Sequence, residues 1–429
     1  MSRRARVLVL GLAVLSVLGG AAGDLSAPRA ARAASQASDR SAVQSLLDAR
    51  AAAVLAGDRD AFMATIDRGA RSFRKRQRIL FDGMRRVPLG TYRLEAEWQR
   101  YGDLARERDR KVYEADDVAL PVTVERYRVR GFDRAEAVEE FFYTFVKRGD
   151  RWLIADDDDL DDVGMYSTRH LWDFGDLEVD RSRHFLSLRH TCDAPIGCAS
   201  VSSDLLKDTE VALERVRRYW PERWSRKVLV LAPTNVEELA RMLQTTFPLD
   251  TFVAFAYSSE DQTEGIEYTG HRILLNPVAF AGRTGEGELN ILAHELLHVA
   301  SRDLSGPFIP YFVEEGIAEY VGGAGDPRGQ DFLASQLASG AVDGRLPRDH
   351  DFLLGSGNSI YLSYVESASA MTYFAERYGP DALVALYRAA GRPDLTAGTA
   401  RYHVDRAFRK VTGSGLRSFE RAWADSIGA

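Results

Sequence analysis

The pattern of apolar positions changes along the chain. Apolar residues recur at helical spacing over 41–67, where "AGDRD" divides the segment into two helices. From about residue 91 the pattern becomes strand-like, in the segments 91–101, 122–132 and 139–157. The last of these contains the turn "KRGDR", which predicts a β-hairpin. Helices followed by long strands predict an α+β domain over 36–165, in which a curved sheet wraps a helix.

A second domain is predicted over 166–429. Helices are predicted over 204–220 and, from a capping box formed by Thr234 and Glu237, over 234–244. Strand-like segments lie at 184–190, 226–233, 250–257 and 271–277. From Asn290 onward helical patterns dominate to the end of the sequence. This order predicts a second α+β domain with a helical C-terminal lobe.

The first residues have the layout of a secretory signal. Three arginines precede an apolar run over 7–22, and small residues follow it. This run is shorter than the roughly 20 residues of a membrane-spanning helix, so export with cleavage is favoured over an uncleaved membrane anchor. Residues 1–35 are interpreted as signal peptide and leader, and 24–38 are expected to be flexible. The mature protein is therefore expected to be secreted or at the cell surface.

The composition and net charge of the chain limit which classes of binding partner are expected. The 429 residues are 45% hydrophobic and 28% charged, as in ordinary folded proteins. The net charge of −7 speaks against nucleic acid, which needs a basic face. Two cysteines, Cys192 and Cys198, close a short loop containing proline and glycine. In an exported chain they predict a local disulfide.

An acidic run, "ADDDDLDD" at 155–162, ends the first predicted domain. Clustered carboxylates are suitable ligands for calcium. The run lacks the spaced ligands and the glycine of a helical calcium loop. We therefore expect a solvated acidic linker here rather than a calcium site.

Candidate chemistry appears in "LNILAHELLHVASRD", residues 289–303. His294 and His298 are four apart on a predicted helix, so both imidazoles can reach a single Zn²⁺. Glu295 points beside that face, where it can take a proton from an attacking water. The rest of this helix is mostly apolar, so its polar residues need a functional reason.

Catalytic zinc usually takes three protein ligands, so a third ligand is needed. Leu304 and Ser301 stand where the metzincin pattern requires a ligand and a glycine, which excludes that pattern. A carboxylate from the next predicted helix remains. That helix, "PYFVEEGIAEYVGG" at 310–323, starts with a proline and ends with two glycines, as helices often do.

Three glutamates lie in this second helix. Glu315 and Glu319 are four apart and share the face that can look at a metal. Glu314 is about 100° around the helix from Glu315, so it is expected to meet solvent.

The two motifs together resemble a known family. "HELLH" followed by "YFVEEGIAEYV" resembles the gluzincin metallopeptidases and, more narrowly, the peptidase MA-like proteins with E-G-x-A-E-Y. The resemblance implies that Glu315 is the third zinc ligand. It further implies that Glu319 orients a ligand histidine through its other ring nitrogen. Tyr311 and Phe312 replace the tryptophan usual in the family.

The resemblance continues downstream. "YVESASAMTYFAERYG", 364–379, is similar to a helix that carries a tyrosine in aminopeptidase-type gluzincins. It implies that the Tyr364 hydroxyl stabilises an oxyanion. Tyr361 is an alternative, and His350 and His403 are further candidates for that role.

Substrate specificity is less defined. The aminopeptidase motif that holds a free amine is missing from "GIEYTGHRILLNP". Its part "HRILLNP", 271–277, is expected to be an edge strand on which an extended peptide lies. We therefore do not predict aminopeptidase specificity; the sequence is compatible with an endopeptidase, or leaves the specificity undefined.

The first domain carries a separate resemblance. "GDRWLIADDD" as a closing strand, together with the element order, is similar to the cone-shaped domains related to nuclear transport factor two. Such folds serve as pockets, enzymes or spacers. A binding or spacer role is expected here.

The sequence thus predicts a cone-like α+β domain followed by a zincin-type α+β peptidase domain. The expected activity is hydrolysis of a peptide or protein substrate with Zn²⁺ as cofactor. Two alternatives stay open. One is a structural-zinc binding or adaptor protein that uses the N-terminal domain, and the other is a metal-dependent hydrolase of a non-peptide amide or ester.

Overall fold

The chain folds into two compact units in this computed structural model. The structure describes residues 26–190, 204–249, 252–261, 267–306, 308–323, 327–391 and 399–429. Unit 1 comprises Met1–Arg130 and Glu136–Asp176, and unit 2 comprises Gly131–Ala135 and Leu177–Ala429. The predicted signal segment up to residue 25 and both cysteines lie outside the described residues. The chain is mixed α+β, as expected from the sequence.

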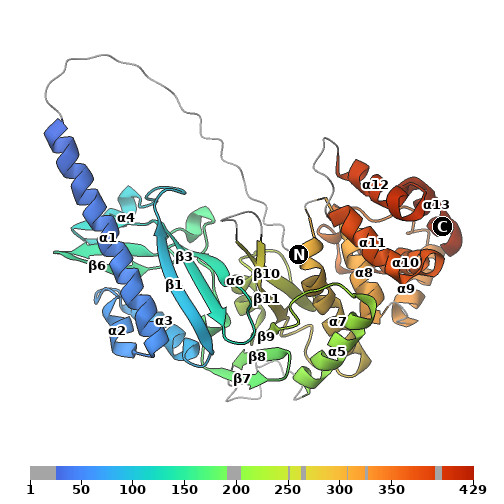
Figure 1. Cartoon of the computed structure of the whole chain (residues 1–429), viewed down its shortest axis with the longest axis horizontal. Coiled ribbons are helices and arrows are strands. Elements are labelled where there is room, and N and C mark those ends of the chain that lie inside the picture. The colour runs from blue at the N-terminus through green and yellow to red at the C-terminus, as the bar shows by residue number, and fades with distance from the viewer. Residues whose placement is uncertain are drawn as a thin grey trace, which may run out of the picture. The chain divides into compact units, whose positions relative to one another are not determined.

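Unit 1 begins with helices and continues with two small antiparallel sheets. Its helices are α1 (Ser26–Ala56), α2 (Arg59–Ala64), α3 (Arg71–Met84) and α4 (Glu107–Tyr113). Its strands are β1 (Leu89–Glu97), β2 (Asp117–Ala119), β3 (Val122–Val129), β4 (Ala137–Phe141), β5 (Thr144–Arg148) and β6 (Arg151–Asp156). The sheet orders are β1-β3-β4 and β2-β5-β6, and α1 packs along β1 (Figure 1). The hairpin predicted at "KRGDR" is confirmed as β5–β6.

The expectation of a flexible leader over 24–38 is wrong for its described part. Helix α1 already begins at Ser26, and its residues 34–38 are helical although they are exposed. This stretch is rich in alanine, the residue with the highest helix propensity. The helix extends beyond its packed part because local propensity continues where the apolar spacing stops.

The acidic run at 155–162 is not a solvated linker. Arg169 makes two hydrogen bonds to the buried carboxylate of Asp157, at 2.5 and 2.9 Å. Arg76 forms ion pairs with Asp156, Asp157 and Asp158. The three carboxylates are close enough to hold a metal ion, but a guanidinium already contacts each of them. A calcium ion there would have to displace Arg76, so these residues form an ion-pair network.

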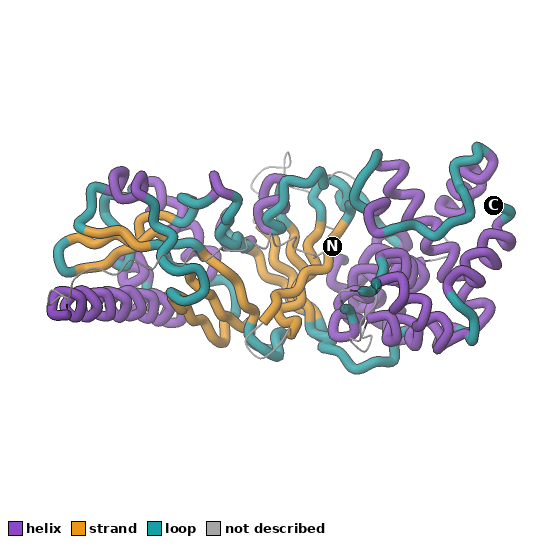
Figure 2. Tube along the Cα trace, turned by 90° about the horizontal axis from the view of Figure 1, so that it is seen from above, coloured by secondary structure: helices purple, strands orange, loops and turns teal. Residues whose placement is uncertain are grey.

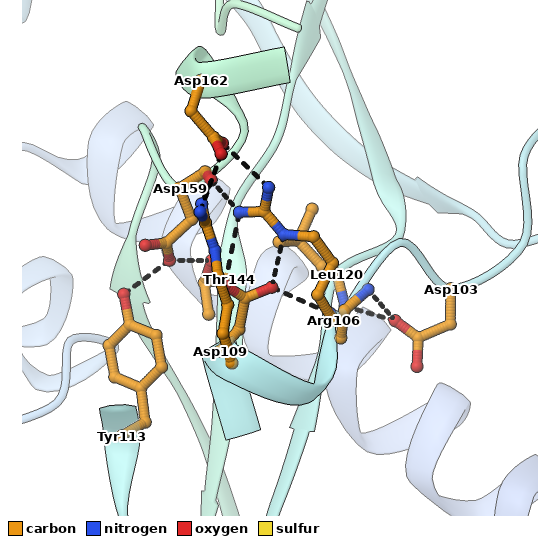
Figure 3. Close-up of polar contacts among 10 residues, drawn as sticks. Asp103, Arg106, Asp109, Tyr113, Leu120, Thr144, Asp159 and Asp162 are labelled. Carbon is orange, nitrogen blue, oxygen red and sulfur yellow. Dashed lines mark hydrogen bonds and ion pairs between the residues drawn. The ribbon is translucent and has the colours of Figure 1, made fainter. Parts of the chain in front are cut away.

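The later part of the run is bound to unit 1 in the same way. Figure 3 shows Asp159 accepting hydrogen bonds from Tyr113 (2.5 Å) and Thr144 (2.6 Å). Arg106 donates to Asp162 at 2.8 Å and to Asp109 at 3.0 Å. The run of consecutive aspartates suggested solvent exposure, but arginine, tyrosine and threonine side chains from other parts of unit 1 bind several of these carboxylates. Unit 1 accordingly runs to Asp176, beyond the boundary expected at 165.

Unit 2 is built on a five-stranded mixed sheet in the order β10-β11-β9-β8-β7. The strands are β7 (Leu177–Arg181), β8 (Phe185–His190), β9 (Val228–Ala232), β10 (Ala254–Asp261) and β11 (Glu267–Leu275). β9 is parallel to both β8 and β11, whereas β7 and β10 are antiparallel to their neighbours. The segment expected to be an edge strand, 271–277, is therefore wrongly placed. Residues 271–275 lie in β11, which pairs on both sides, and the two edge strands of this sheet are β10 and β7.

Helices make up the rest of unit 2. They are α5 (Leu205–Tyr219), α6 (Val236–Met242), α7 (Glu286–Ser301), α8 (Tyr311–Gly323), α9 (Pro327–Ala338), α10 (Gly357–Tyr378), α11 (Pro380–Gly391), α12 (Ala400–Thr412) and α13 (Leu416–Ile427). α7 packs against β10 and β11, and α8 packs against both α7 and α10. The C-terminus lies in the helical half, which confirms the helical C-terminal lobe (Figure 2). Within the described chain, no helix combines the length and apolar character needed to cross a bilayer.

One buried carboxyl in this half has a measurable consequence. Glu288 on α7 is fully buried, and neither of its oxygens has a hydrogen-bond partner among the described residues. Burial, together with Asp208 and Asp204, raises its pKa from 4.5 to about 7. At a pH between 4.5 and about 7, such a carboxyl is therefore protonated more often in the folded state than in the unfolded state. Its contribution to stability is therefore lost as pH rises from about 4.5 to 7.

We expect Glu288→Gln to remove this loss. Urea unfolding at pH 5 and pH 8 should show a smaller decrease in the free energy of unfolding for Glu288→Gln than for wild type. Glu286→Gln, an exposed change two residues away on α7, should keep the wild-type dependence. Identical pH dependence in wild type and Glu288→Gln would contradict the assignment.

Candidate metal centre

Helix α7 presents both histidines of the H-E-x-x-H motif on one face. Its apolar residues Leu292, Leu296, Leu297 and Val299 are buried and anchor the helix in the core of unit 2. The four-residue spacing brings the two rings together, with His294 Nε2 and His298 Nε2 at 3.0 Å. The predicted helix and the convergence of its two histidines are thus found in the structure.

Helix α8 brings a carboxylate to the same point. Glu315 Oε2 lies 3.2 Å from His298 Nε2 and 3.3 Å from His294 Nε2. A tetrahedral zinc ion with bonds of about 2.1 Å places its ligand atoms about 3.4 Å apart. Two imidazole nitrogens and one carboxylate oxygen with separations of 3.0–3.3 Å match that spacing and that ligand chemistry. The residues therefore fit a zinc ion with three protein ligands and room for a fourth.

Two glycines of α8 allow its close approach to the neighbouring helices. A Cβ on Gly316 would lie 2.6 Å from the backbone oxygen of Ser367 on α10. A Cβ on Gly322 would lie 2.8 Å from the backbone oxygen of Asn290 on α7. Both distances are shorter than real side chains tolerate. The glycines around Glu315 thus set how near its carboxylate comes to the histidines.

Contacts among the candidate ligands shift the pKa values of His294 and Glu315. Burial alone lowers the pKa of His294, but hydrogen bonds to Glu315 and Glu319 outweigh it and raise the pKa well above 6.5. Burial alone raises the pKa of Glu315, but the charges and hydrogen bonds of His298 and His294 bring it well below 4.5. The buried carboxylate is therefore ionised and needs positive charge beside it, which protonated imidazole or a metal supplies.

Glu319 contacts the outer nitrogen of one histidine. Its Oε1 lies 3.0 Å from His294 Nδ1, and its side chain is 40% exposed. An ionised carboxylate at this position accepts the Nδ1 hydrogen, which leaves the Nε2 lone pair free to bind a metal. This is the arrangement that the family resemblance implied for Glu319.

A cleft of about 400 Å³ opens beside the candidate ligand His294, whereas His298 and Glu315 are not among its lining residues. Glu295 lines it together with His294, and so do Tyr361 and Tyr364. The rings of Tyr364 and His294 are 6.4 Å apart, centroid to centroid. Burial and then the carboxylates Glu315 and Glu295 raise the pKa of Tyr364 well above 10, so its hydroxyl stays protonated.

The other candidates for the oxyanion role lie elsewhere. His350 is half exposed and contacts Asp351 at 3.1 Å, while His403 is buried against Phe308. Neither lines the cleft described above. Tyr361 does line it, but its side chain is largely exposed and packs on Phe332, with ring centroids 5.0 Å apart.

The helical wheel predicted that Glu314 meets solvent, but in the structure Glu314 also makes hydrogen bonds within the protein. Its Oε1 accepts hydrogen bonds from Ser305 (2.9 Å) and from the buried Tyr387 (3.1 Å). It faces away from the histidines, as expected, but toward α11. The helical wheel placed Glu314 off the metal face, and only the packing of α11 showed what it meets.

Arg215 is a supporting residue that the motifs did not indicate. From α5 it donates to the side-chain oxygen of Asn290 (2.7 Å) and to the backbone oxygen of Gly322 (2.8 Å). These bonds tie the N-terminal half of α7 to the end of α8. No spacing rule predicts them, because 75 residues separate Arg215 from Asn290.

Comparison with models of known protein families gives no match, and comparison with curated proteins gives no significant match either. The interpretation of the site therefore rests on its residues and their geometry.

Replacing Gly316 by alanine should loosen the site. We expect Gly316→Ala to lower the free energy of unfolding by about 1–3 kcal/mol, because the new methyl group forces α8 and α10 apart. Zinc affinity should fall as well, because Glu315 moves with α8. Urea unfolding and zinc titration measure the two effects.

The control is Gly287→Ala on α7, where a Cβ meets no heavy atom within 4 Å. It should raise the free energy of unfolding by about 0.5–1 kcal/mol through helix propensity. If Gly316→Ala behaves like this control, close packing does not position Glu315.

The three neighbouring glutamates should differ when each is replaced by alanine. Glu315→Ala should abolish tight zinc binding, and Glu319→Ala should weaken it. Glu314→Ala should bind zinc like wild type, yet lose about 1–3 kcal/mol of stability because the hydrogen bonds that Ser305 and the buried Tyr387 donate to Glu314 are lost. Metal analysis after dialysis and urea unfolding test this order. Loss of zinc in Glu314→Ala without loss in Glu315→Ala would contradict the ligand assignment.

Proposed function

We propose that this chain is an exported zinc metallopeptidase of gluzincin type. The proposal is supported chiefly by one observation. Three donor atoms from α7 and α8 converge at 3.0–3.3 Å beside a cleft that Glu295 also lines. Export rests on the signal-like layout of the first residues.

The candidate ligand set is suited to zinc and leaves a fourth coordination position open. His294, His298 and Glu315 would hold zinc, and Glu319 would orient His294. Bound zinc supplies a Lewis acid that polarises the scissile carbonyl and lowers the pKa of a water molecule. Three protein ligands are typical of catalytic zinc sites, whereas structural zinc sites are usually closed by four.

Glu295 and Tyr364 would act on the substrate. Glu295 is buried and lines the cleft, and its carboxylate makes no hydrogen bond within the described part of the chain. It can therefore accept a proton from the attacking water and deliver it to the leaving amine. Tyr364, kept protonated by its raised pKa, can donate a hydrogen bond to the oxyanion of the tetrahedral intermediate.

The sheet edge offers a place for an extended substrate. β10 is an edge strand, and Phe252, Val253 and Ala254 at its start line the cleft. A peptide backbone laid along β10 would extend the sheet and cross the cleft beside Glu295. This edge replaces the one that the sequence suggested at 271–277.

Replacing Glu295 by glutamine tests the mechanism. Glu295→Gln should bind about one zinc ion per chain, as wild type should, because Glu295 is not among the three ligands. Cleavage of a proteome-derived peptide library should fall by about 10²–10⁴-fold or more, because the general base is lost. Metal analysis and mass spectrometry of the library measure the two properties.

Glu286→Gln, an exposed change on the same helix, serves as the control and should cleave like wild type. Full activity in Glu295→Gln would disprove the mechanism. Bound zinc without cleavage of any peptide by wild type would favour a structural site, or a hydrolase of non-peptide amides or esters. Wild type without zinc would exclude the ligand assignment itself.

A further inference from the structure

A second pocket adjoins the cleft of the candidate metal centre. The cleft measures about 400 Å³ and the second pocket about 440 Å³. Three residues line both of them: Glu319, Gly323 and Tyr361. A polypeptide in one pocket can therefore continue into the other by passing over these residues. We call the second pocket the α9–α10 groove.

Small and apolar side chains form the walls of this groove. α9 contributes Leu333, Ala334 and Leu337, while α10 contributes Val365 and Ala368. Leu333 and Val365 are buried and belong to a small hydrophobic cluster. An apolar side chain inserted between the two helices would lose contact with water, and each fully buried large side chain contributes about 1.5–3 kcal/mol.

The charges in the groove have one sign. Among the residues that the structure describes, its charged lining residues are Glu319 and Glu376, and neither lysine nor arginine lines it. Glu319 is engaged with His294, whereas Glu376 is exposed and has no hydrogen bond or ion pair within the described residues. The cleft beside the histidines differs, because Arg283 and Arg328 line it. A lysine or arginine is therefore better matched to the groove than to the cleft.

We propose that the α9–α10 groove binds a part of the substrate distant from the cleaved bond, an apolar side chain next to a lysine or arginine. The proposal rests on the proposed peptidase function. It deepens that function by naming a substrate class: extended polypeptides rather than dipeptides or free amino-acid derivatives. Continuity with the cleft favours substrate over a second copy of the chain, because an occupant of the groove leads directly to the candidate ligands.

Matched peptides test the groove through hydrolysis. A cleaved sequence from the library is synthesised with Leu-Lys or with Gly-Glu several residues from the cleaved bond, on either side of it. We expect kcat/KM to be about tenfold higher for one Leu-Lys peptide than for its Gly-Glu partner. Ala334→Trp, which fills the groove, should remove this preference by raising KM for the Leu-Lys peptide. Short peptides that span only the cleft should be cleaved as by wild type.

Neighbouring changes provide the controls. Ser335→Trp places the same bulk on the next, exposed residue of α9, which does not line the groove, and should keep the preference. Glu376→Lys should reverse the preference for lysine over glutamate. Asp381→Lys, an exposed change of the same charge on α11, should not.

Binding is measured separately from cleavage in the Glu295→Gln background. Fluorescence anisotropy with the labelled Leu-Lys peptide should show weaker binding when Ala334→Trp is added and unchanged binding when Ser335→Trp is added. Equal binding by both double variants would overturn the groove proposal, even if wild type cleaves peptides. A dimer that Ala334→Trp dissociates, with no effect of the peptide, would overturn it in favour of a second copy of the chain. Groove-dependent binding without cleavage by wild type would retain the groove and disprove the peptidase.

Discussion

The close packing of α8 between α7 and α10 is the constraint on which the candidate site depends. α7 alone presents two histidines, but two ligands do not make a catalytic zinc site. The third donor reaches them because Gly316 and Gly322 let α8 approach its neighbours without a side chain between the backbones. Arg215 then ties α7 to the end of α8 through Asn290 and Gly322. The site is therefore a product of helix–helix distance as much as of ligand identity.

The electrostatics of the site follow from this packing. A carboxylate buried between two imidazoles is costly unless positive charge accompanies it. In the structure the charges and hydrogen bonds of His298 and His294 lower the pKa of Glu315, while hydrogen bonds to Glu315 and Glu319 raise the pKa of His294. The same arrangement suits a divalent cation. Buried ionisable groups of this kind are concentrated at functional sites more often than elsewhere.

Unit 1 also contains buried charges, but there opposite charges or neutral polar and aromatic side chains contact them. Asp157 is matched by Arg169, and Glu125 lies 2.6 Å from His170. Arg50 is fully buried with its guanidinium 3.8 Å from the Phe62 ring centroid, and it donates to Thr65 and Gln77. Such groups hold the helices and sheets of unit 1 together. The proposed chemistry of the chain is carried by unit 2.

Much of the site was predictable from the sequence because its signals are local. The spacing of His294, Glu295 and His298 sets one helical face, and the proline and glycines around Glu315 set the bounds of α8. The hairpin at "KRGDR" and the order of helices and strands are local in the same sense. Local sequence patterns gave wrong predictions where contacts between residues distant in the sequence determine the structure. Partners far away in the sequence, among them Arg76 and Arg106, bind the aspartates of the run at 155–162. β10 rather than 271–277 is an edge strand, because pairing order is not encoded in any one strand.

The sequence by itself therefore determined which residues can serve as ligands and as general base, since residue type and helical spacing are sufficient for that. Helical spacing also placed Glu314 off the face shared by Glu315 and Glu319, but only the tertiary structure decided what each of the three glutamates contacts. Glu314, Glu315 and Glu319 are alike in sequence, but α11, α7 and solvent surround them differently. Glu314 accepts a hydrogen bond from the buried Tyr387, Glu315 joins both Nε2 atoms, and Glu319 reaches Nδ1 of His294. The physical reason is that a helix fixes the direction of each side chain, while the packing of the other helices fixes what lies in that direction.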